Sequence, residues 1–358
     1  MSRIATSQGD ALKARAAKVI PKGVYGHQSV QAHSRRTPQF FARARGAHVW
    51  DYDENRYIDY LCAFGPNLLG YAHPAIDEAY QRQMRDVDTC VGPSARMVEL
   101  AEAYVEQFQH AQWAMFCKNG TDATTIGLMS ARAFRNKRKV LRATGAYHGA
   151  TTWCTPMEPG TLPEEKAHFI NYEYGNVDSL RAAAELAGDD LAGVIATPFR
   201  HEVIQPQFVP EAVFAQEARA LCDRADALLI LDDVRAGLRL SRECSWAAFG
   251  VAPDLVAWGK TLANGHALSA VTGNERSRPA ASDIFVTGSF WMGAAALAAG
   301  LETLSHLRTS DYLEVTVRLG ERLRAGLEGV ARQSGLSIDQ TGPAQMPLIM
   351  INGEDGER

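Results

Sequence analysis

The chain has 358 residues, of which 46% are hydrophobic and 22% charged, and its formal net charge is -4. This length is enough for a large core and two unequal domains, and the composition is that of a folded globular chain. The slightly negative charge argues against nucleic acid as a partner, and no apolar run approaches the roughly 20 residues that span a bilayer. These features exclude a nucleic-acid-binding protein and a membrane-spanning one.

The N-terminal stretch MSRIATSQGDALKARAAKVI predicts an amphipathic helix and lacks the apolar centre of a signal peptide. The cysteines form no C-x-x-C pair, and no H-E-x-x-H or close Cys/His cluster offers zinc-ligand spacing. We therefore expect reduced thiols, no metal and a cytoplasmic location. The six cysteines are Cys62, Cys90, Cys117, Cys154, Cys222 and Cys244.

Residues 1–65 combine loops with short alternating segments. The segment PQFFARARGAHVWDYDENRYIDYL alternates, turns at Asp53-Glu54-Asn55 and alternates again, which predicts a β-hairpin. We expect these residues to belong to a small domain. A helix is expected directly after His73-Pro74.

From about residue 95, short apolar segments alternate with longer helical patterns. Fully apolar strands between helices predict an α/β fold with a mostly parallel central sheet and helices on both faces. Ligands bind beyond the carboxyl ends of such strands. The segments are WAMFCKNG (113–120), KVLRATGAYHG (139–149), LAGVIATP (191–198), ALLILDDV (227–234), DLVAWGK (254–260) and ALSAVTG (267–273).

After residue 291 two helical patterns lead into the beginning of a further β structure. We therefore expect a large α/β domain over residues 66–300. Residues 301–358 are expected to begin a small C-terminal α+β domain, of which this chain holds only the start.

Lys260 follows a glycine and precedes a threonine in DLVAWGKTLANG (254–265), and two explanations compete. A phosphate-binding P-loop needs glycine five residues before its Gly-Lys-Thr, but Asp254 stands there. An acid at that position cannot make the tight turn that glycine makes, and it repels a triphosphate. The alternative is a lysine that forms an imine with a cofactor aldehyde.

Pyridoxal phosphate needs more than a lysine. Its phosphate needs the N–H groups of a helix N-terminus, and its ring nitrogen needs an acid. The turn KNGTDATT supplies Gly120 and Thr121 at the start of a helix, and LILDDV places Asp232 at the end of a buried strand. Val234 follows on the same face of that strand, and Tyr147 or His148 could stack on the ring.

Each of these signals is weak alone, because an Asn-Gly-Thr turn, an acidic strand end and a buried Tyr-His pair all occur for structural reasons. Arg235 and Arg239, after the acid strand, are interpreted as surface residues or structural salt-bridge partners, and not as residues that bind the substrate. The order along the chain carries the argument: phosphate turn, aromatic residue, acid and lysine follow at successive strand ends.

With this set of motifs the chain resembles the class III aminotransferases of fold type I, and within them most closely the glutamate-1-semialdehyde aminomutase-like branch. The resemblance covers nearly the whole chain, from IPKGVYG at residue 20 onward. The motifs that carry it are HVWDYDENRYIDYLCAFGPNLLGYAHP, NGTDAT, YHG, LILDDVRAGLRL, DLVAWGKTLANGHALSAVTG and VTGSFWMGAAALAAG.

The resemblance implies pyridoxal 5'-phosphate as cofactor, with an amino donor and a carbonyl acceptor as substrates. Lys260 would form the internal aldimine and move the proton, and Asp232 would pair with the ring nitrogen. Val234 and Tyr147 would pack on the ring, with His148 nearby. Gly120 and Thr121 would hold the phosphate.

The resemblance also implies a homodimer with shared active sites. In the family a threonine of the partner subunit reaches the phosphate, and Ser289 in TGSFW stands at that position, with Thr287 close by.

The chain departs from the family pattern in three respects, and the lack of an arginine bears on the substrate. Thr197-Pro198 stands where many members have Glu-Pro, and PKGVYGHQSV (21–30) lacks the arginine that aminomutases use for a carboxylate. Family members also continue for roughly another 70–90 residues, which complete the small domain. A β-amino acid, an amino sugar or another amine therefore fits as well as glutamate semialdehyde.

The main expectation is thus a pyridoxal-phosphate-dependent aminotransferase. An aminomutase, which completes both half-reactions on one molecule, is the first alternative. A catalytically impaired homologue that only binds the cofactor, and a racemase or epimerase on the same fold, are the others.

Overall fold

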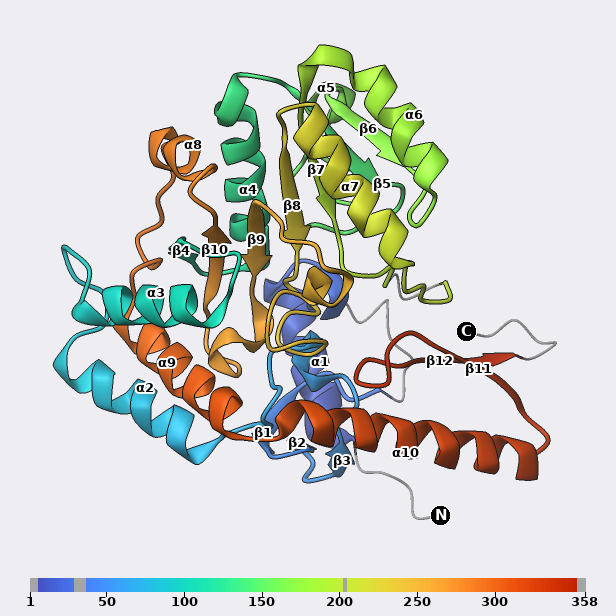
Figure 1. Ribbon diagram of the computed structural model, residues 1–358. Coiled ribbons are helices and arrows are strands. Elements are labelled where there is room, and N and C mark those ends of the chain that lie inside the picture. Colours follow the sequence, from blue (N-terminus) through green and yellow to red (C-terminus); the bar gives the residue numbers. More distant parts are fainter. Residues whose placement is uncertain (1–5, 29–36, 202–204, 353–358) are drawn as a thin grey trace.

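A computed structural model describes residues 6–28, 37–201 and 205–352 (Figure 1). Its centre is a seven-stranded sheet in which every neighbouring pair is parallel except the two pairs made by β10. In spatial order the strands are β4 (Trp113–Cys117), β10 (Ser269–Gly273), β9 (Leu255–Trp258), β8 (Leu228–Asp232), β7 (Leu191–Ala196), β5 (Lys139–Ala143) and β6 (Phe169–Tyr172).

The central strands β7 and β9 are apolar throughout and β8 is apolar up to its last residue, Asp232, because both sheet faces are covered. In β8, Leu228 and Ile230 join the core on the α4 side, while Leu229 and Leu231 join the core on the side of α3, α6 and α7. Side chains of a strand alternate between faces, so a strand buried on both faces has no polar position. Figure 1 shows α4 and α7 on opposite faces of β8.

The helices around this sheet follow the expected alternation with strands. Asn119 begins α4 with a capping box, in which its side chain accepts from the Asp122 amide. The helices of the large layer are α2 (Pro74–Asp86), α3 (Ala95–Gln107), α4 (Gly120–Arg135), α5 (Pro163–Lys166), α6 (Val177–Ala187), α7 (Ala212–Arg224), α8 (Arg278–Asp283) and α9 (Ala294–Thr309).

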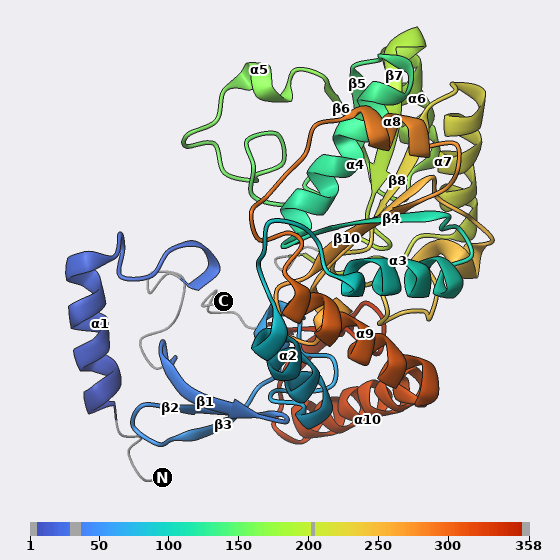
Figure 2. The same cartoon turned by 90° about the vertical axis from the view of Figure 1, so that its left-hand side faces the viewer.

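A separate three-stranded antiparallel sheet lies away from the large sheet (Figure 2). It consists of β1 (Phe41–Arg45), β2 (His48–Asp51) and β3 (Arg56–Ile58), and Asp51 accepts two backbone N–H bonds inside the β2–β3 turn. Asp53 of the same turn accepts from the Gln8 and Gly9 amides at the start of α1 (Ser7–Val19). The turn therefore also caps the N-terminal helix.

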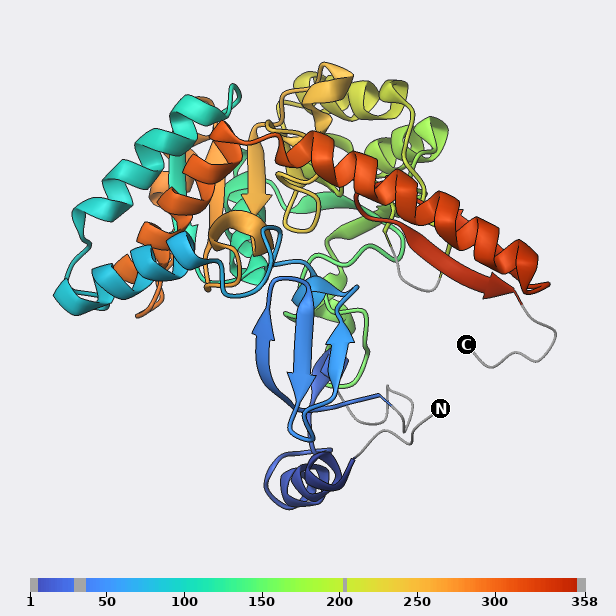
Figure 3. The ribbon, with the colours of Figure 1, turned by 90° about the horizontal axis from the view of Figure 1, so that it is seen from below.

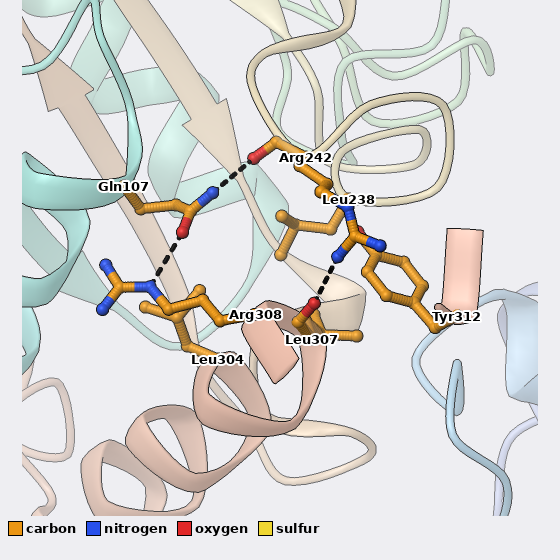
Figure 4. Close-up of a pocket in the computed structure, with 7 residues that line it drawn as sticks. All are labelled: Gln107, Leu238, Arg242, Leu304, Leu307, Arg308 and Tyr312. Carbon is orange, nitrogen blue, oxygen red and sulfur yellow. Dashed lines mark hydrogen bonds between the residues drawn. The ribbon is translucent and has the colours of Figure 1, made fainter. Parts of the chain in front are cut away.

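The C-terminal part of the described chain is the long helix α10 (Tyr312–Gln333), followed by the hairpin β11 (Ser337–Thr341) and β12 (Leu348–Asn352) (Figure 3). Arg242 joins α9 to α10, because it donates to the carbonyls of Leu307 and Ser310 and to the Glu314 carboxylate. A cavity of about 110 Å³ lies at this junction (Figure 4). It holds none of the predicted site residues.

The predicted fold class is confirmed, whereas the predicted domain boundaries stay predictions. The sheet is mostly parallel with helices on both faces, the N-terminal helix and the hairpin form, and two helices lead into the terminal β structure. Strand β6 was not among the predicted segments. Its sequence FINY is short and half-buried at the edge of the sheet, so it lacks the continuous apolar pattern of the other strands. No helix within the described ranges is long and apolar enough to cross a membrane.

Candidate active site

The predicted site residues gather at the carboxyl edge of the large sheet. Gly120, His148 and Lys260 follow β4, β5 and β9, and Asp232 is the last residue of β8; these four strands are mutually parallel. Parallel strands end at one edge of a sheet, so residues distant in the chain meet there. The contacts described below show how closely they meet.

The turn before α4 packs directly on the acid strand. A Cβ added to Gly120 would lie 2.5 Å from Cγ1 of Val234, and one added to Gly259 would lie 3.1 Å from the same atom. Only glycine fits at these contacts, which bring the first backbone N–H groups of α4 to the strand ends. The Asp122 amide is used by the Asn119 cap, whereas the Gly120 and Thr121 amides have no partner within the helix, which is the arrangement that binds phosphate.

Gly120→Ala is therefore expected to lower the free energy of unfolding by about 1–3 kcal/mol, because the added methyl group overpacks Val234. It should also weaken binding of pyridoxal phosphate, since the turn must shift to relieve the contact. Urea unfolding of the apoenzyme and a cofactor titration measure the two effects. Gly326→Ala in α10, where an added Cβ meets nothing within 4 Å, is the matched control and should leave cofactor binding unchanged.

Asp232 is held by two hydrogen bonds. His148 Nδ1 lies 2.7 Å from Asp232 Oδ2, and the Val234 amide donates to Oδ1 at 3.2 Å. Both side chains are buried, and the His148 ring stacks on Trp153 with 6.3 Å between centroids. Because a carboxylate oxygen only accepts, His148 Nδ1 carries the proton in this pair. The acid is thus fixed in orientation by a histidine from another strand end.

Lys260 begins the short helix η5 (Lys260–Ala263) and has left-handed backbone, with φ of 49°. Burial lowers the pKa of its amine, because the charged form loses solvation, while the nearby Asp232 carboxylate opposes this shift. Arg235 and Arg239 add to the lowering. A buried lysine with a lowered pKa is available as a nucleophile and as a proton carrier.

Thr121 and Tyr147 also lie at this edge. The Thr121 hydroxyl accepts from the Ala150 amide at 3.2 Å, and a Cβ added to Gly149 would lie 2.6 Å from Thr121 Oγ1. Tyr147 directly precedes His148 and is 39% exposed. The loop after β5 thus lies against the first turn of α4.

Within the described residues, no hydrogen bond joins Thr287 or Ser289 to the other predicted site residues. Both are exposed, in the segment between α8 and α9. Their neighbours Phe285, Phe290 and Met292 are 86%, 67% and 47% exposed. The predicted role of Thr287 and Ser289 requires a partner subunit, so it stays a prediction.

Arg239 was expected at the surface or in a structural salt bridge, and the described residues place it in neither. It is buried, and its Nη2 donates to the Gly65 carbonyl. Arg235 Nη1 donates to the His201 carbonyl at 2.6 Å. Burial and the Arg235 cation lower the pKa of His201 to about 3, so this imidazole is neutral.

Thr197 stands where many members of the resembled family have a carboxylate. In this structure it makes local hydrogen bonds that stabilise the turn after β7. Its hydroxyl donates to the Phe199 carbonyl at 3.0 Å, and its carbonyl accepts from the Tyr174 hydroxyl at 2.7 Å. The segment 21–30, which lacks the aminomutase arginine, continues into residues outside the described ranges.

Asp233 points away from Asp232 and accepts from both the amide and the hydroxyl of Ser245, at 2.8 Å and 2.6 Å. Burial raises its pKa to about 7 despite these bonds. Because the folded-state pKa lies above the unfolded value, its stabilising contribution is full at acid pH and is lost as pH rises toward 7.

Asp233→Asn is expected to remove this pH dependence. The free energy of unfolding of the wild type, relative to the variant, should fall between about pH 4 and pH 7 and become constant above it. Urea unfolding of both apoproteins across this range measures the difference. A difference that stays constant with pH would show that Asp233 is ionised throughout.

These residues fit pyridoxal phosphate. The glycine-lined turn at Gly120 offers unpaired helix N–H groups to a phosphate, and the Asp232–His148 pair offers a fixed acceptor to a ring nitrogen. Lys260 offers an amine at the same sheet edge. The fold and the site define a pyridoxal-phosphate-dependent enzyme of fold type I.

Comparison with known proteins gives the family. A sequence model of "Aminotransferase class-III" matches residues 29–340. An aminopentol aminotransferase of Sphingopyxis macrogoltabida is 51% identical over 346 residues, covering 97% of this chain and 82% of that protein. The chain belongs to the class III aminotransferases.

A solved structure and a more distant relative agree with this assignment. The pyridoxal-phosphate internal aldimine form of the FumI protein of Sphingopyxis sp. MTA144 has a TM-score of 0.96 and 49% identity, covering 97% of this chain and 84% of that one. A glutamate-1-semialdehyde 2,1-aminomutase of Halalkalibacterium halodurans is 32% identical over 336 residues, with 89% and 77% covered. The predicted family and cofactor are confirmed: the protein is a pyridoxal-phosphate-dependent aminotransferase. Aminomutases are related to it at lower identity.

Proposed function

We propose that Lys260 carries the cofactor and moves the proton in an amino transfer from an amine to a carbonyl acceptor. The observation that supports this most is the meeting of three groups at one sheet edge: the Gly120 turn, the Asp232–His148 pair and buried Lys260. Pyridoxal phosphate, when bound, supplies the carbonyl that accepts the amine and a cationic ring that withdraws electrons.

The residues of the chain supply the rest. The first N–H groups of α4, with Thr121, bind the phosphate and favour its negative charge. Asp232, oriented by His148, stabilises a positive charge on the ring nitrogen. Val234 and Tyr147 hold the ring from its two faces.

Lys260 acts as base and acid in turn. Its lowered pKa favours the uncharged amine, so Lys260 can take a proton from the carbon that bears the substrate nitrogen. The Asp232 carboxylate would stabilise the resulting ammonium, and Lys260 Nζ would then release the proton again. Burial excludes water that would compete for this proton.

For the amino donor we propose an amine of the aminopentol type, which carries hydroxyl groups. The support is the 51% identity with an aminopentol aminotransferase over nearly the whole chain. The neutral Thr197 at a position where related enzymes have a carboxylate also fits a donor other than glutamate semialdehyde.

A single-turnover experiment tests this proposal. The holoenzyme is mixed with aminopentol or with a 2-amino acid, without acceptor, and the ketone formed is measured by mass spectrometry. We expect one ketone per active site from aminopentol, and continued turnover only after a 2-oxo acid is added. Rearranged amine formed repeatedly without an acceptor would instead establish an aminomutase, and absence of any product would contradict amino transfer.

We also propose a cytoplasmic homodimer in which Thr287 and Ser289 of one subunit approach the phosphate site of the other. The exposed apolar side chains around them would be covered by a partner. The free state of all six cysteines agrees with a reducing compartment. Sedimentation of wild type and Phe290→Asp tests the dimer, since the charge should weaken association and cofactor binding together.

A further inference from the structure

A left-handed turn precedes Gly65 and lies against Lys260. Cys62, Ala63 and Phe64 have φ values of 50°, 52° and 63°, and Gly65 follows with 112°. Left-handed backbone is unfavourable for every residue that carries a Cβ, and it normally occurs as isolated residues. Three such residues in sequence persist only where surrounding contacts hold them, and they are found preferentially at functional sites.

Two further left-handed residues belong to the segments that meet this turn. Leu238 and Lys260 have φ values of 62° and 49°. A Cβ added to Gly65 would lie 3.1 Å from Cδ of Lys260 and 3.6 Å from Nη2 of Arg239. Gly65 of the turn therefore packs closely on the aliphatic part of Lys260, and an added side chain would displace the lysine by a few tenths of an ångström.

The turn is held at both ends. Arg239, which is buried and 174 residues away in the chain, donates from Nη2 to the Gly65 carbonyl. Asp59 accepts from the Leu61 amide at 2.7 Å and from the Tyr71 hydroxyl at 2.6 Å. The Arg239 contact is the one that ties the turn to the loop after the acid strand.

We propose that Arg239 is a positioning residue, which holds the Cys62–Gly65 turn against Lys260 and so fixes the place from which the lysine amine acts. The inference rests on the proposed function, because it matters only if Lys260 carries the cofactor. A lysine side chain has four rotatable bonds, so packing along its stem decides where its amine lies. Displacement by about 1 Å can cost on the order of a hundredfold in rate.

Two variants release the turn by different means. Arg239→Met removes the donor and keeps a long apolar side chain, whereas Gly65→Ala adds a methyl group against Lys260 at a φ that alanine avoids. In the apoenzyme, both should raise hydrogen exchange in the peptide covering residues 59–68 and raise the acetylation rate of Lys260 by acetic anhydride, read by mass spectrometry. In the holoenzyme, kcat should fall on the order of a hundredfold.

A rescue separates positioning from a general structural role. Glycine adopts left-handed backbone without penalty, so Ala63→Gly added to Arg239→Met should restore part of the exchange protection and of kcat. Arg138→Met, which breaks a surface ion pair with Asp190, is the matched control and should change neither measurement.

Wild-type exchange and wild-type Lys260 acetylation in both Arg239→Met and Gly65→Ala would overturn the inference. If Arg239→Met does not fold, Gly65→Ala carries the test alone. Failure of the proposed function would give a different result: borohydride would then not fix the cofactor to Lys260 in the wild-type enzyme.

Discussion

Replacing Lys260 with alanine is expected to lower kcat by about four orders of magnitude, the upper end of what one proton-transferring group contributes. The variant loses both the amine that attaches the cofactor and the group that moves the proton. Steady-state transamination with the best donor measures the loss. Folding should be preserved, because the substitution removes a buried amine whose charge is disfavoured by its surroundings.

Lys137→Ala is the matched control for this prediction. Lys137 donates to the Ala225 carbonyl far from the predicted site residues, so its loss should leave kcat unchanged. A Lys260→Ala enzyme that retained more than about a tenth of wild-type kcat would show that another group performs the proton transfer, since such groups contribute at least about a hundredfold.

Replacing Asp232 with asparagine is expected to lower kcat/KM by about 10²- to 10³-fold, as removal of a preorganised electrostatic partner does elsewhere. Asparagine keeps the shape, but its single oxygen can accept from only one of the His148 ring and the Val234 amide, so the change removes the negative charge together with one accepted hydrogen bond. The decrease in kcat/KM should come from a lower kcat, because the charge matters most when the ring withdraws electrons.

Asp226→Asn is the control for the loss of an acid. Asp226 forms exposed ion pairs with Arg135 and Arg276, and such pairs contribute little to stability. We expect it to be fully active. Equal kcat for Asp232→Asn and wild type would remove Asp232 from the proposed mechanism.

Much of the large sheet could be predicted because its strands are buried on both faces. ALLILDDV is apolar until the strand ends and then acidic, which locates both the strand and its functional end. The rule that parallel strands share a carboxyl edge then brings Gly120, His148, Asp232 and Lys260 together. The order of these motifs along the chain was sufficient to place the four residues at one edge of the sheet without knowledge of any contact.

The pairings between these segments could not be predicted in the same way. His148 and Asp232 are 84 residues apart, and Arg239 and Gly65 are 174 apart. No local pattern encodes which long-range donor meets which acceptor. The left-handed turn was also missed, because the usual sequence signals for such backbone are glycine and asparagine, whereas Cys62, Ala63 and Phe64 form it here.

Asp232 and Asp233 are adjacent, but their side chains point to opposite faces of the strand and have different partners. Asp232 continues the face of Leu228 and Ile230 and meets His148, whereas Asp233 turns to the opposite side and binds Ser245. The sequence DD alone gives no reason to treat them differently until the direction of each side chain is known. That direction follows from the strand, because successive side chains point to opposite faces of the sheet.

The measurement that tests the central proposal most directly is reduction of the wild-type holoenzyme with borohydride, followed by peptide mass mapping. We expect a visible absorbance band that disappears on reduction, and a single peptide containing Lys260 that gains the mass of the reduced cofactor. Attachment to another lysine, or no attachment in folded enzyme saturated with pyridoxal phosphate, would contradict the role proposed for Lys260.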